Sequence, residues 1–173
     1  YPGETDEQFG RLLSFVEQEE FDHVGVFTWS PEPGTKAFDL PDRVDPAVAE
    51  DRRNRIMEAQ QAISLRKNRA LVGQRLQVLI EGTGETEDAF GRVEPISAGR
   101  ARRHAPEVDG LVFIPGAHPI GSMIDVEIAE ATEYDLWAAD DRVTAATPMT
   151  GRRQRPRINR KRRSLPMAKL PGT

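Results

Sequence analysis

The sequence predicts an α+β chain in which part of an α/β unit is followed by a linking helix and a small antiparallel OB-like β-barrel. A capped amphipathic helix precedes a short apolar run near the start of the chain, which is typical of an α/β unit. Residues 75–129 change to a period of two, with turn residues between four or five short runs, which is typical of a small barrel. The 173 residues suffice for one ordinary domain and a fraction of another.

Composition excludes several classes of function. Hydrophobic residues make up 38 % and charged residues 30 %, the polar end of globular composition. Cysteine is absent, which excludes disulfides, thiolate nucleophiles and cysteine-bound metal centres in this chain. The sequence has neither a signal peptide nor an apolar run near the roughly 18–20 residues that span a bilayer, so we expect a cytoplasmic protein without a membrane partner. Because the first residue is Tyr1, we expect the carboxy-terminal part of a longer protein.

Charge is divided unevenly along the chain. Residues 1–68 carry 8 Lys/Arg against 14 Asp/Glu, a net charge of −6. Residues 69–137 carry 6 against 12, again −6, whereas residues 138–173 carry 10 against 2, a net charge of +8. An acidic barrel repels the phosphates of a nucleic acid over most of its surface and attracts a basic protein. This asymmetry therefore favours a protein partner for the barrel.

The first elements form a turn, a helix and a strand. Tyr1–Glu4 contains Pro-Gly and predicts a turn, and Thr5 with Gln8 forms a capping box that starts a helix. Apolar residues then follow the helical spacing, at Phe9, Leu12, Leu13 and Val16. The apolar run Val24–Trp29 lacks alternation, so we expect a strand covered on both faces, as in a parallel sheet.

A loop and a long helix come next. Ser30–Thr35 contains two prolines and a glycine and predicts a loop. Asp45 before Pro46 predicts a helix start, with the aspartate as N-cap and the proline at the first helical position. The helix is expected over residues 46–70, with a thin apolar stripe that suits a link between two domains, and with Gly73 as the stop.

Short strands are predicted beyond this helix. The period of two starts at Arg75, and we expect Gly82–Gly84 to turn the chain into a hairpin. Further strands are expected at 89–96, 110–114 and 123–129. The last segment is rich in basic residues among prolines, which predicts disorder; these residues are Arg152, Arg153, Arg155, Arg157, Arg160, Lys161, Arg162 and Arg163.

Each candidate for chemistry has a structural alternative. The three histidines are scattered without metal-ligand spacing, and Gly82–Gly84 lacks the Lys-Ser/Thr of a phosphate-binding loop. The turn Pro2–Thr5 would lie at the end of a parallel sheet where ligands bind, although many such turns only connect elements. The basic tail either binds nucleic acid through its phosphates or is simply solvated.

Four motifs resemble one family, the methylthiotransferases of the radical S-adenosylmethionine superfamily. They are YPGET (1–5), VGVFTWSPEPGTKA (24–37), EVDGLVFI (107–114) and AEATEYDLW (129–137). The resemblance covers residues 1–138, and it implies the terminal part of a radical-SAM TIM-like α/β barrel followed by a TRAM domain.

The motifs resemble the branch that methylthiolates an aspartate of a small-subunit ribosomal protein. The loop Ser30–Gly34 is acidic here, whereas the branch that modifies tRNA typically has an arginine in it. The acidic barrel agrees with a basic protein substrate. The tRNA-modifying branch, or a stand-alone TRAM-type RNA-binding module, is the alternative.

The resemblance implies an enzyme that uses S-adenosylmethionine and two 4Fe-4S clusters to add a methylthio group to the β-carbon of the aspartate. The clusters need cysteine ligands, which this chain lacks, so we predict that the 173 residues alone are inactive. By match to the family, Pro2, Gly3, Glu4 and Thr5 are expected near the cofactor. The residues expected to dock the substrate are Ser30, Glu32, Gly34, Thr35, Asp109, Tyr134, Asp135 and Trp137.

The expected organisation has three parts. Residues 1–68 end the radical-SAM barrel and include the linking helix, residues 69–138 form the TRAM domain, and residues 139–173 are a basic, disordered tail. We expect a monomer whose partner is a small-subunit ribosomal protein, with contact to rRNA through the tail.

Overall fold

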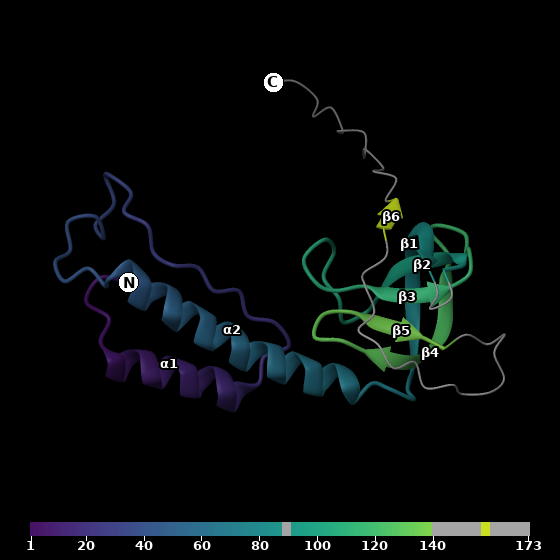
Figure 1. Cartoon of the computed structure of the whole chain (residues 1–173), viewed down its shortest axis with the longest axis horizontal. Coiled ribbons are helices and arrows are strands. Elements are labelled where there is room, and N and C mark those ends of the chain that lie inside the picture. Colours follow the sequence, from purple (N-terminus) through teal and green to yellow (C-terminus); the bar gives the residue numbers. More distant parts are fainter. Residues whose placement is uncertain (88–90, 140–156, 160–173) are drawn as a thin grey trace, which may run out of the picture. The chain divides into compact units, whose positions relative to one another are not determined.

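The computed structural model describes residues 1–87 and 91–139 and the backbone of 157–159 (Figure 1). The chain divides into two compact units. The helical unit consists of Tyr1–Gly73 together with Glu130–Leu136, and the barrel unit consists of Gln74–Ala129 and the residues from Trp137 onward. Each unit has its own core.

Two helices, α1 (Asp6–Glu19) and α2 (Pro46–Arg69), form the helical unit. The predicted capping box is present, because the Gln8 amide donates to the Thr5 hydroxyl and the Thr5 amide donates to the Gln8 side chain. The Asp45 carboxylate accepts from the Ala47 amide, so the predicted start of the second helix is also confirmed. Both helices therefore begin where their capping residues place them.

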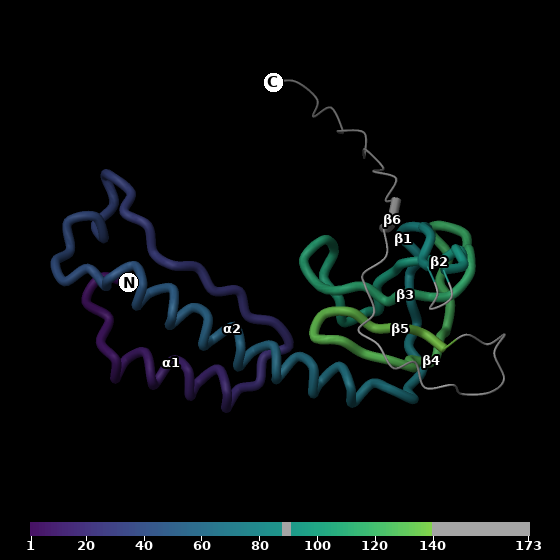
Figure 2. The backbone as a smooth tube through the Cα atoms, viewed as in Figure 1, coloured from purple at the N-terminus to yellow at the C-terminus, as the bar shows by residue number. Residues whose placement is uncertain are grey.

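The two helices run side by side in the same direction, as Figures 1 and 2 show. Arg52 near the start of α2 contacts Glu4 before α1, and Gln60 further along α2 binds the carbonyl oxygen of Phe21 beyond the end of α1. The two helices also share an apolar cluster formed by Phe9, Val16, Ile56 and Ile63.

The strand predicted at Val24–Trp29 is wrong. The structure describes no strand within Tyr1–Gly73. Val24 and Val26 pack against the apolar cluster of the helices, whereas Phe27 is 91 % exposed. A strand buried on both faces needs neighbouring strands to pair its backbone and cover its second face, and the described residues of the helical unit offer none. The expected end of an α/β barrel at residues 1–68 thus stays a prediction.

The barrel unit contains a sheet whose strand order is β2-β3-β5-β4-β1-β6, with β1 also pairing with β2. Five strands therefore close a ring, as in an OB-like barrel. Pairing is antiparallel between β1 and each of β2, β4 and β6, and between β2 and β3. The strands are β1 (Arg75–Glu87), β2 (Val93–Ala101), β3 (Val112–Pro115), β4 (Met123–Ala131), β5 (Leu136–Ala138) and β6 (Arg157–Asn159).

The turn predicted at Gly82–Gly84 is wrong, because β1 continues through it to Glu87. The register with β2 shifts between Ile80 and Gly82, which marks a bulge, and glycine in a strand often accompanies such a bend. Across the same ladder, Gly99 has no room for a side chain, since an added Cβ would overlap the Leu79 carbonyl oxygen and lie 2.7 Å from Val78 Cγ1. The long, bent β1 thus replaces the expected hairpin.

The core of the barrel unit is apolar with one buried hydroxyl. Phe113 and Trp137 lie with ring centroids 4.6 Å apart, within a cluster completed by Ile96, Ala98 and Leu111. Ser97 is fully buried, where its hydroxyl donates to the Gly116 carbonyl and accepts from the His118 amide, both at 2.9 Å. The short β5, which supplies Trp137, was not among the predicted strands.

The predicted disordered tail at 139–173 lies largely outside the described residues. Within it, Arg157–Asn159 form β6, which pairs with Thr83–Glu85 of β1, so disorder is the wrong prediction for these three residues. In the described part of the chain, neither helix has the length and apolar character needed to cross a membrane.

Candidate functional site

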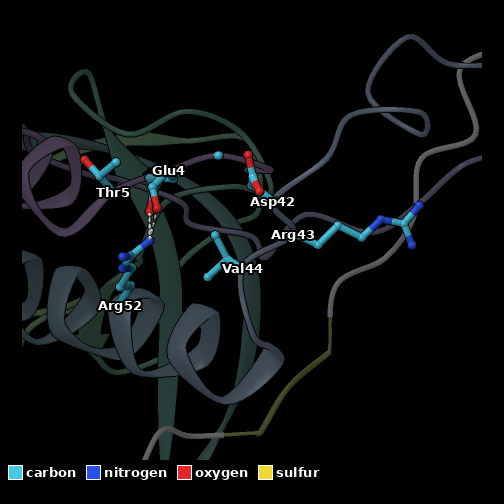
Figure 3. Close-up of a pocket in the computed structure, with 7 residues that line it drawn as sticks. Glu4, Thr5, Asp42, Arg43, Val44 and Arg52 are labelled. Carbon is cyan, nitrogen blue, oxygen red and sulfur yellow. Dashed lines mark hydrogen bonds and ion pairs between the residues drawn. The ribbon is translucent and has the colours of Figure 1, made fainter.

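A pocket of about 450 Å³ lies beside the amino-terminal turn. Figure 3 shows Glu4 and Arg52 facing one another in this pocket, while the Arg43 side chain extends away from the pair. The lining residues come from the turn, from the loop before α2 and from α2 itself: Gly3, Glu4, Thr5, Asp42, Arg43, Val44 and Arg52. The pocket is wide open to solvent, so these residues would form one wall of a ligand site.

Arg52 is the centre of the polar contacts here. Its Nη1 donates to Glu4 Oε1 at 2.7 Å and to the Glu4 carbonyl at 3.1 Å, and its Nη2 donates to Asp6 Oδ1 at 2.7 Å. The guanidinium carbon also lies 5.4 Å from the centroid of the buried Phe9 ring. Arg52 therefore joins the second turn of α2 to the residues that start α1, and its charge is compensated by two carboxylates.

The carboxylates further favour the charged form of Arg52. The hydrogen bond with Asp6 raises the pKa of Arg52 above its ordinary value, burial opposes this, and the Glu4 hydrogen bond and the charges of both acids add to the rise. Since arginine is already charged at any physiological pH, the arrangement fixes a permanent cation that orients the Glu4 carboxylate.

The loop that follows Val24–Trp29 returns to the same turn. The Gly3 amide donates to the Asp42 carbonyl at 2.8 Å. The Tyr1 and Trp29 rings meet edge-on with centroids 6.4 Å apart, and the Arg43 guanidinium lies 5.7 Å from the Trp29 centroid and 5.4 Å from the Phe38 centroid. Residues separated by up to about forty positions in the chain thus gather at the turn.

The four residues predicted near the cofactor have distinct positions. Gly3, Glu4 and Thr5 line the pocket, whereas Pro2 is buried. Gly3 has φ +78°, a conformation that glycine adopts without strain, and Thr5 caps α1 through its hydroxyl. Glu4, held by Arg52, is thus the acidic side chain that the predicted turn contributes to the pocket.

The structure does not bring the predicted docking residues of the loop into this pocket. Glu32 and Thr35 close a turn, in which the Thr35 hydroxyl donates to the Glu32 carbonyl at 2.8 Å. Gly34 allows this turn through its φ of +85°. Ser30, Glu32 and Thr35 are all exposed, and their side chains are available to a partner.

The remaining predicted docking residues divide by burial. Tyr134 is 49 % exposed, and its hydroxyl accepts from the Gln61 side chain at 2.9 Å. Asp109 is partly buried and accepts from the Ala105 amide at 2.6 Å, while Asp135 is buried and its amide donates to the Thr132 hydroxyl. Trp137 is only 4 % exposed and belongs to the apolar core, so its ring is not part of a docking surface.

Sequence reasoning missed Arg52, Asp42 and Val44. Arg52 belongs to a buried face of α2 that continues through Ile56, Gln60, Ser64 and Asn68. The spacing of four residues places these side chains on one face of a helix, and this spacing was a usable signal. Four of the five residues are polar, so a search for an apolar stripe misses those four. Among the described residues, no group of three or more His, Asp or Glu side chains could hold a metal ion.

Comparison with known proteins identifies relatives of both units. Residues 72–139 match the family model described as TRAM domain. A protein of Microcystis aeruginosa is 50 % identical over 138 residues, covering 79 % of this chain and 30 % of its own length. One from Chloroflexus aurantiacus is 47 % identical over 137 residues (79 % and 29 %), and one from Synechococcus is 43 % identical over 152 residues (88 % and 32 %).

All three relatives are named ribosomal protein uS12 methylthiotransferase RimO, and the chain spans about three-tenths of their length. Residues 72–173 are too few to supply 138 aligned positions, so the similarity includes residues of the helical unit. The resemblance expected from the four motifs is confirmed: this chain contains a TRAM domain and is similar to methylthiotransferases of the RimO kind.

Proposed function

We propose that this chain is the carboxy-terminal part of an enzyme that adds a methylthio group to the β-carbon of an aspartate in the small-subunit ribosomal protein uS12. The observation that carries the proposal is the 50 % identity to a relative of that name over 138 residues. Because 138 aligned residues are more than the TRAM domain at 72–139 contains, the similarity includes residues of the helical unit as well.

The charge of the barrel supports a protein substrate. Residues 69–137 carry twice as many acidic as basic residues, which favours a basic protein over the phosphates of tRNA or rRNA. In the helical unit, the loop residues Ser30, Glu32 and Thr35 are exposed and Tyr134 is half-exposed, so their side chains are accessible to the same partner. In this proposal the TRAM domain docks uS12, and the basic tail contacts rRNA.

The iron–sulfur clusters of such an enzyme do not fit this chain. A 4Fe-4S cluster is held by cysteine thiolates, and the chain contains no cysteine. We therefore assign the cluster ligands to a part of the enzyme outside these 173 residues, and the isolated chain is inactive.

S-adenosylmethionine fits the pocket at the amino-terminal turn better. Its cationic groups would be attracted by the carboxylates of Glu4 and Asp42, which both line the pocket, and Arg52 holds the Glu4 carboxylate in place at 2.7 Å. When bound, the cofactor would supply the radical chemistry of the reaction. The chain's own contribution is one wall of the pocket, with Glu4 orienting the cofactor and Arg52 positioning Glu4.

The larger organisation follows from this assignment. Residues 1–68 would complete a radical-SAM barrel, with the exposed face of Val24–Trp29 covered by strands of that barrel, and α2 would link it to the TRAM domain at 69–138. We propose a cytoplasmic monomer that meets its substrate at the small ribosomal subunit.

A chimera tests the proposal. The aligned segment of the Microcystis aeruginosa protein is replaced by the matching residues of this chain, and methylthiolation of uS12 is measured by peptide mass spectrometry in cells that lack their own enzyme. We expect modified uS12. A chimera carrying Glu4→Gln should lose most of this modification, whereas Glu7→Gln, which changes an exposed acid in the first turn of α1, should not.

Two outcomes would overturn the proposal. One is a folded chimera that leaves uS12 unmodified, and the other is a chimera that methylthiolates tRNA instead. The RNA-binding alternative is tested separately with the 173-residue chain, because affinity for single-stranded RNA that remains after removal of residues 142–173 would place RNA recognition in the acidic barrel.

A further inference from the structure

The two edges of β1 pair with different strands. β2 pairs with one edge along Val78–Glu87, whereas β4 pairs with the other edge only along Arg75–Leu79. The loop before β4 extends this second contact by one residue, through hydrogen bonds between Ile80 and residues 121 and 122 at 2.8–2.9 Å. Beyond Ile80, the edge opposite β2 is not covered by β4.

β6 occupies this open part of the edge. Arg157, Ile158 and Asn159 stand opposite Glu85, Gly84 and Thr83, in antiparallel register. The same β1 residues pair with β2 on their other side, so β6 adds a third strand to the projecting end of the β1–β2 ladder. Residues 157–159 thus pair through their backbone with a sheet edge that lies about seventy residues earlier in the sequence.

The charges on the two sides are opposite. The projecting end of the ladder carries the exposed acids Glu85, Glu87 and Glu94. The segment that supplies β6 lies in the part of the chain that holds 10 Lys/Arg against 2 Asp/Glu, and Arg157 is the residue in register with Glu85. An acidic sheet edge attracts a segment of positive net charge.

We propose that the β1 edge at Thr83–Glu85 is a docking site for an extended, arginine- and lysine-rich peptide, and that residues 157–159 are its resident, intramolecular occupant. Backbone pairing with a strand edge gives such a site affinity for any extended chain, and the surrounding glutamates select a basic one. A covered edge is also protected from pairing with other molecules.

β6 competes with any added peptide for the same edge of β1. A tethered strand has an effective concentration of roughly 1 mM, so for a peptide that binds the free edge at roughly 0.1 mM the tether weakens the apparent affinity about tenfold. A basic partner must therefore displace β6 before it pairs with β1. This property concerns peptide binding without any cofactor, so it is independent of the proposed methylthiotransferase activity.

The test uses the full 173-residue chain and a fluorescent peptide with the sequence of residues 152–163. Two variants, Ile158→Pro and Asn159→Pro, are compared with the unaltered chain. Successive residues of a strand direct their amides to opposite edges, so only one of these two prolines removes an N–H group that faces β1, and the other serves as the matched control. A second peptide has the same sequence and charge, but its amides at the positions of 157–159 are N-methylated.

We expect one proline variant to bind the peptide about tenfold more tightly than the unaltered chain, with faster amide hydrogen exchange at Thr83–Glu85 when no peptide is added. The other variant should resemble the unaltered chain, and the N-methylated peptide should bind much more weakly to all three. Equal affinity of the three proteins for the peptide would contradict the proposal that β6 competes with the peptide for the β1 edge. Equal binding of the N-methylated peptide would overturn strand pairing and leave only attraction between charges.

Discussion

Individual residues explain how polar groups are accommodated inside both units. Gln60 and Ser64 lie on the buried face of α2 and bind the carbonyls of Phe21 and Asp22 at 2.8–3.2 Å, and Ser97 binds Gly116 and His118 in the barrel unit. A buried polar group without a partner costs about 1–3 kcal/mol; these donors avoid that cost, whereas the buried side-chain oxygen of Gln60 has no partner. Each of these side chains thus connects its helix or strand to the backbone of a loop.

Gly99 shows the opposite case, a position where no side chain fits. Gly99→Ala would place a methyl group against the Leu79 carbonyl and Val78 Cγ1, and such overpacking costs about 1–3 kcal/mol. We expect a correspondingly lower free energy of unfolding in urea denaturation. The matched control is Gly10→Ala in α1, where nothing lies within 4 Å of the added Cβ and helix propensity predicts a gain of about 0.5–1 kcal/mol. Equal effects of the two substitutions would contradict the close approach of β1 and β2.

Among the elements, the segment Val24–Trp29 depends most on its neighbours. Its one face, with Val24 and Val26, packs against the apolar cluster of α1 and α2, and the other face presents Phe27 to solvent. Because Val24 and Val26 pack against the two helices, this segment keeps its position without pairing in a sheet. The same segment would become a strand if paired strands were supplied on either side.

This asymmetry predicts that substitutions at the adjacent residues Val26 and Phe27 change the free energy of unfolding by different amounts. Val26→Asn removes apolar packing and should destabilise the helical unit by about 1–3 kcal/mol, measured from the helical circular dichroism signal during urea unfolding. Phe27→Ser should change the same free energy by less than about 0.5 kcal/mol. Equal destabilisation by both substitutions would mean that both faces are buried.

At the scale of the whole molecule, the proposed function assigns substrate recognition to one unit of the chain and part of a cofactor pocket to the other. The TRAM domain at 72–139 is acidic, and the pocket at Gly3, Glu4 and Arg52 belongs to the other unit. Neither unit contains a cysteine. The proposed chemistry therefore depends on ligands held outside these residues.

This division predicts that the isolated chain neither assembles a cluster nor turns over. After anaerobic incubation with ferrous iron and sulfide, the desalted protein should show none of the visible absorption of a 4Fe-4S centre, since no thiolate is present to bind it. With S-adenosylmethionine, a reductant and uS12 added, mass spectrometry should detect no methylthiolated aspartate. The chimera with the Microcystis aeruginosa protein is the positive control, and turnover by the isolated chain would contradict the assignment.

Signals that act over a few residues were sufficient to predict much of the molecule. The capping residues Thr5 and Asp45 start both helices, and the alternation from Arg75 and from Met123 places β1 and β4. The turn predicted from Pro2 and Gly3 is present, and its role as a cofactor site stays a prediction. These features depend on hydrogen bonds and side-chain contacts within about four residues.

The sequence by itself determined the helix starts, the alternating strands, the opposite charges of barrel and tail, and the lack of cluster ligands. Only the tertiary structure decided that Val24–Trp29 is not a strand, that Gly82–Gly84 continues β1, that Arg52 meets Glu4 across 48 positions of sequence, and that residues 157–159 pair with β1. The physical reason is that strand pairing and buried ion pairs depend on which distant segments reach the same place, and no local pattern encodes that position.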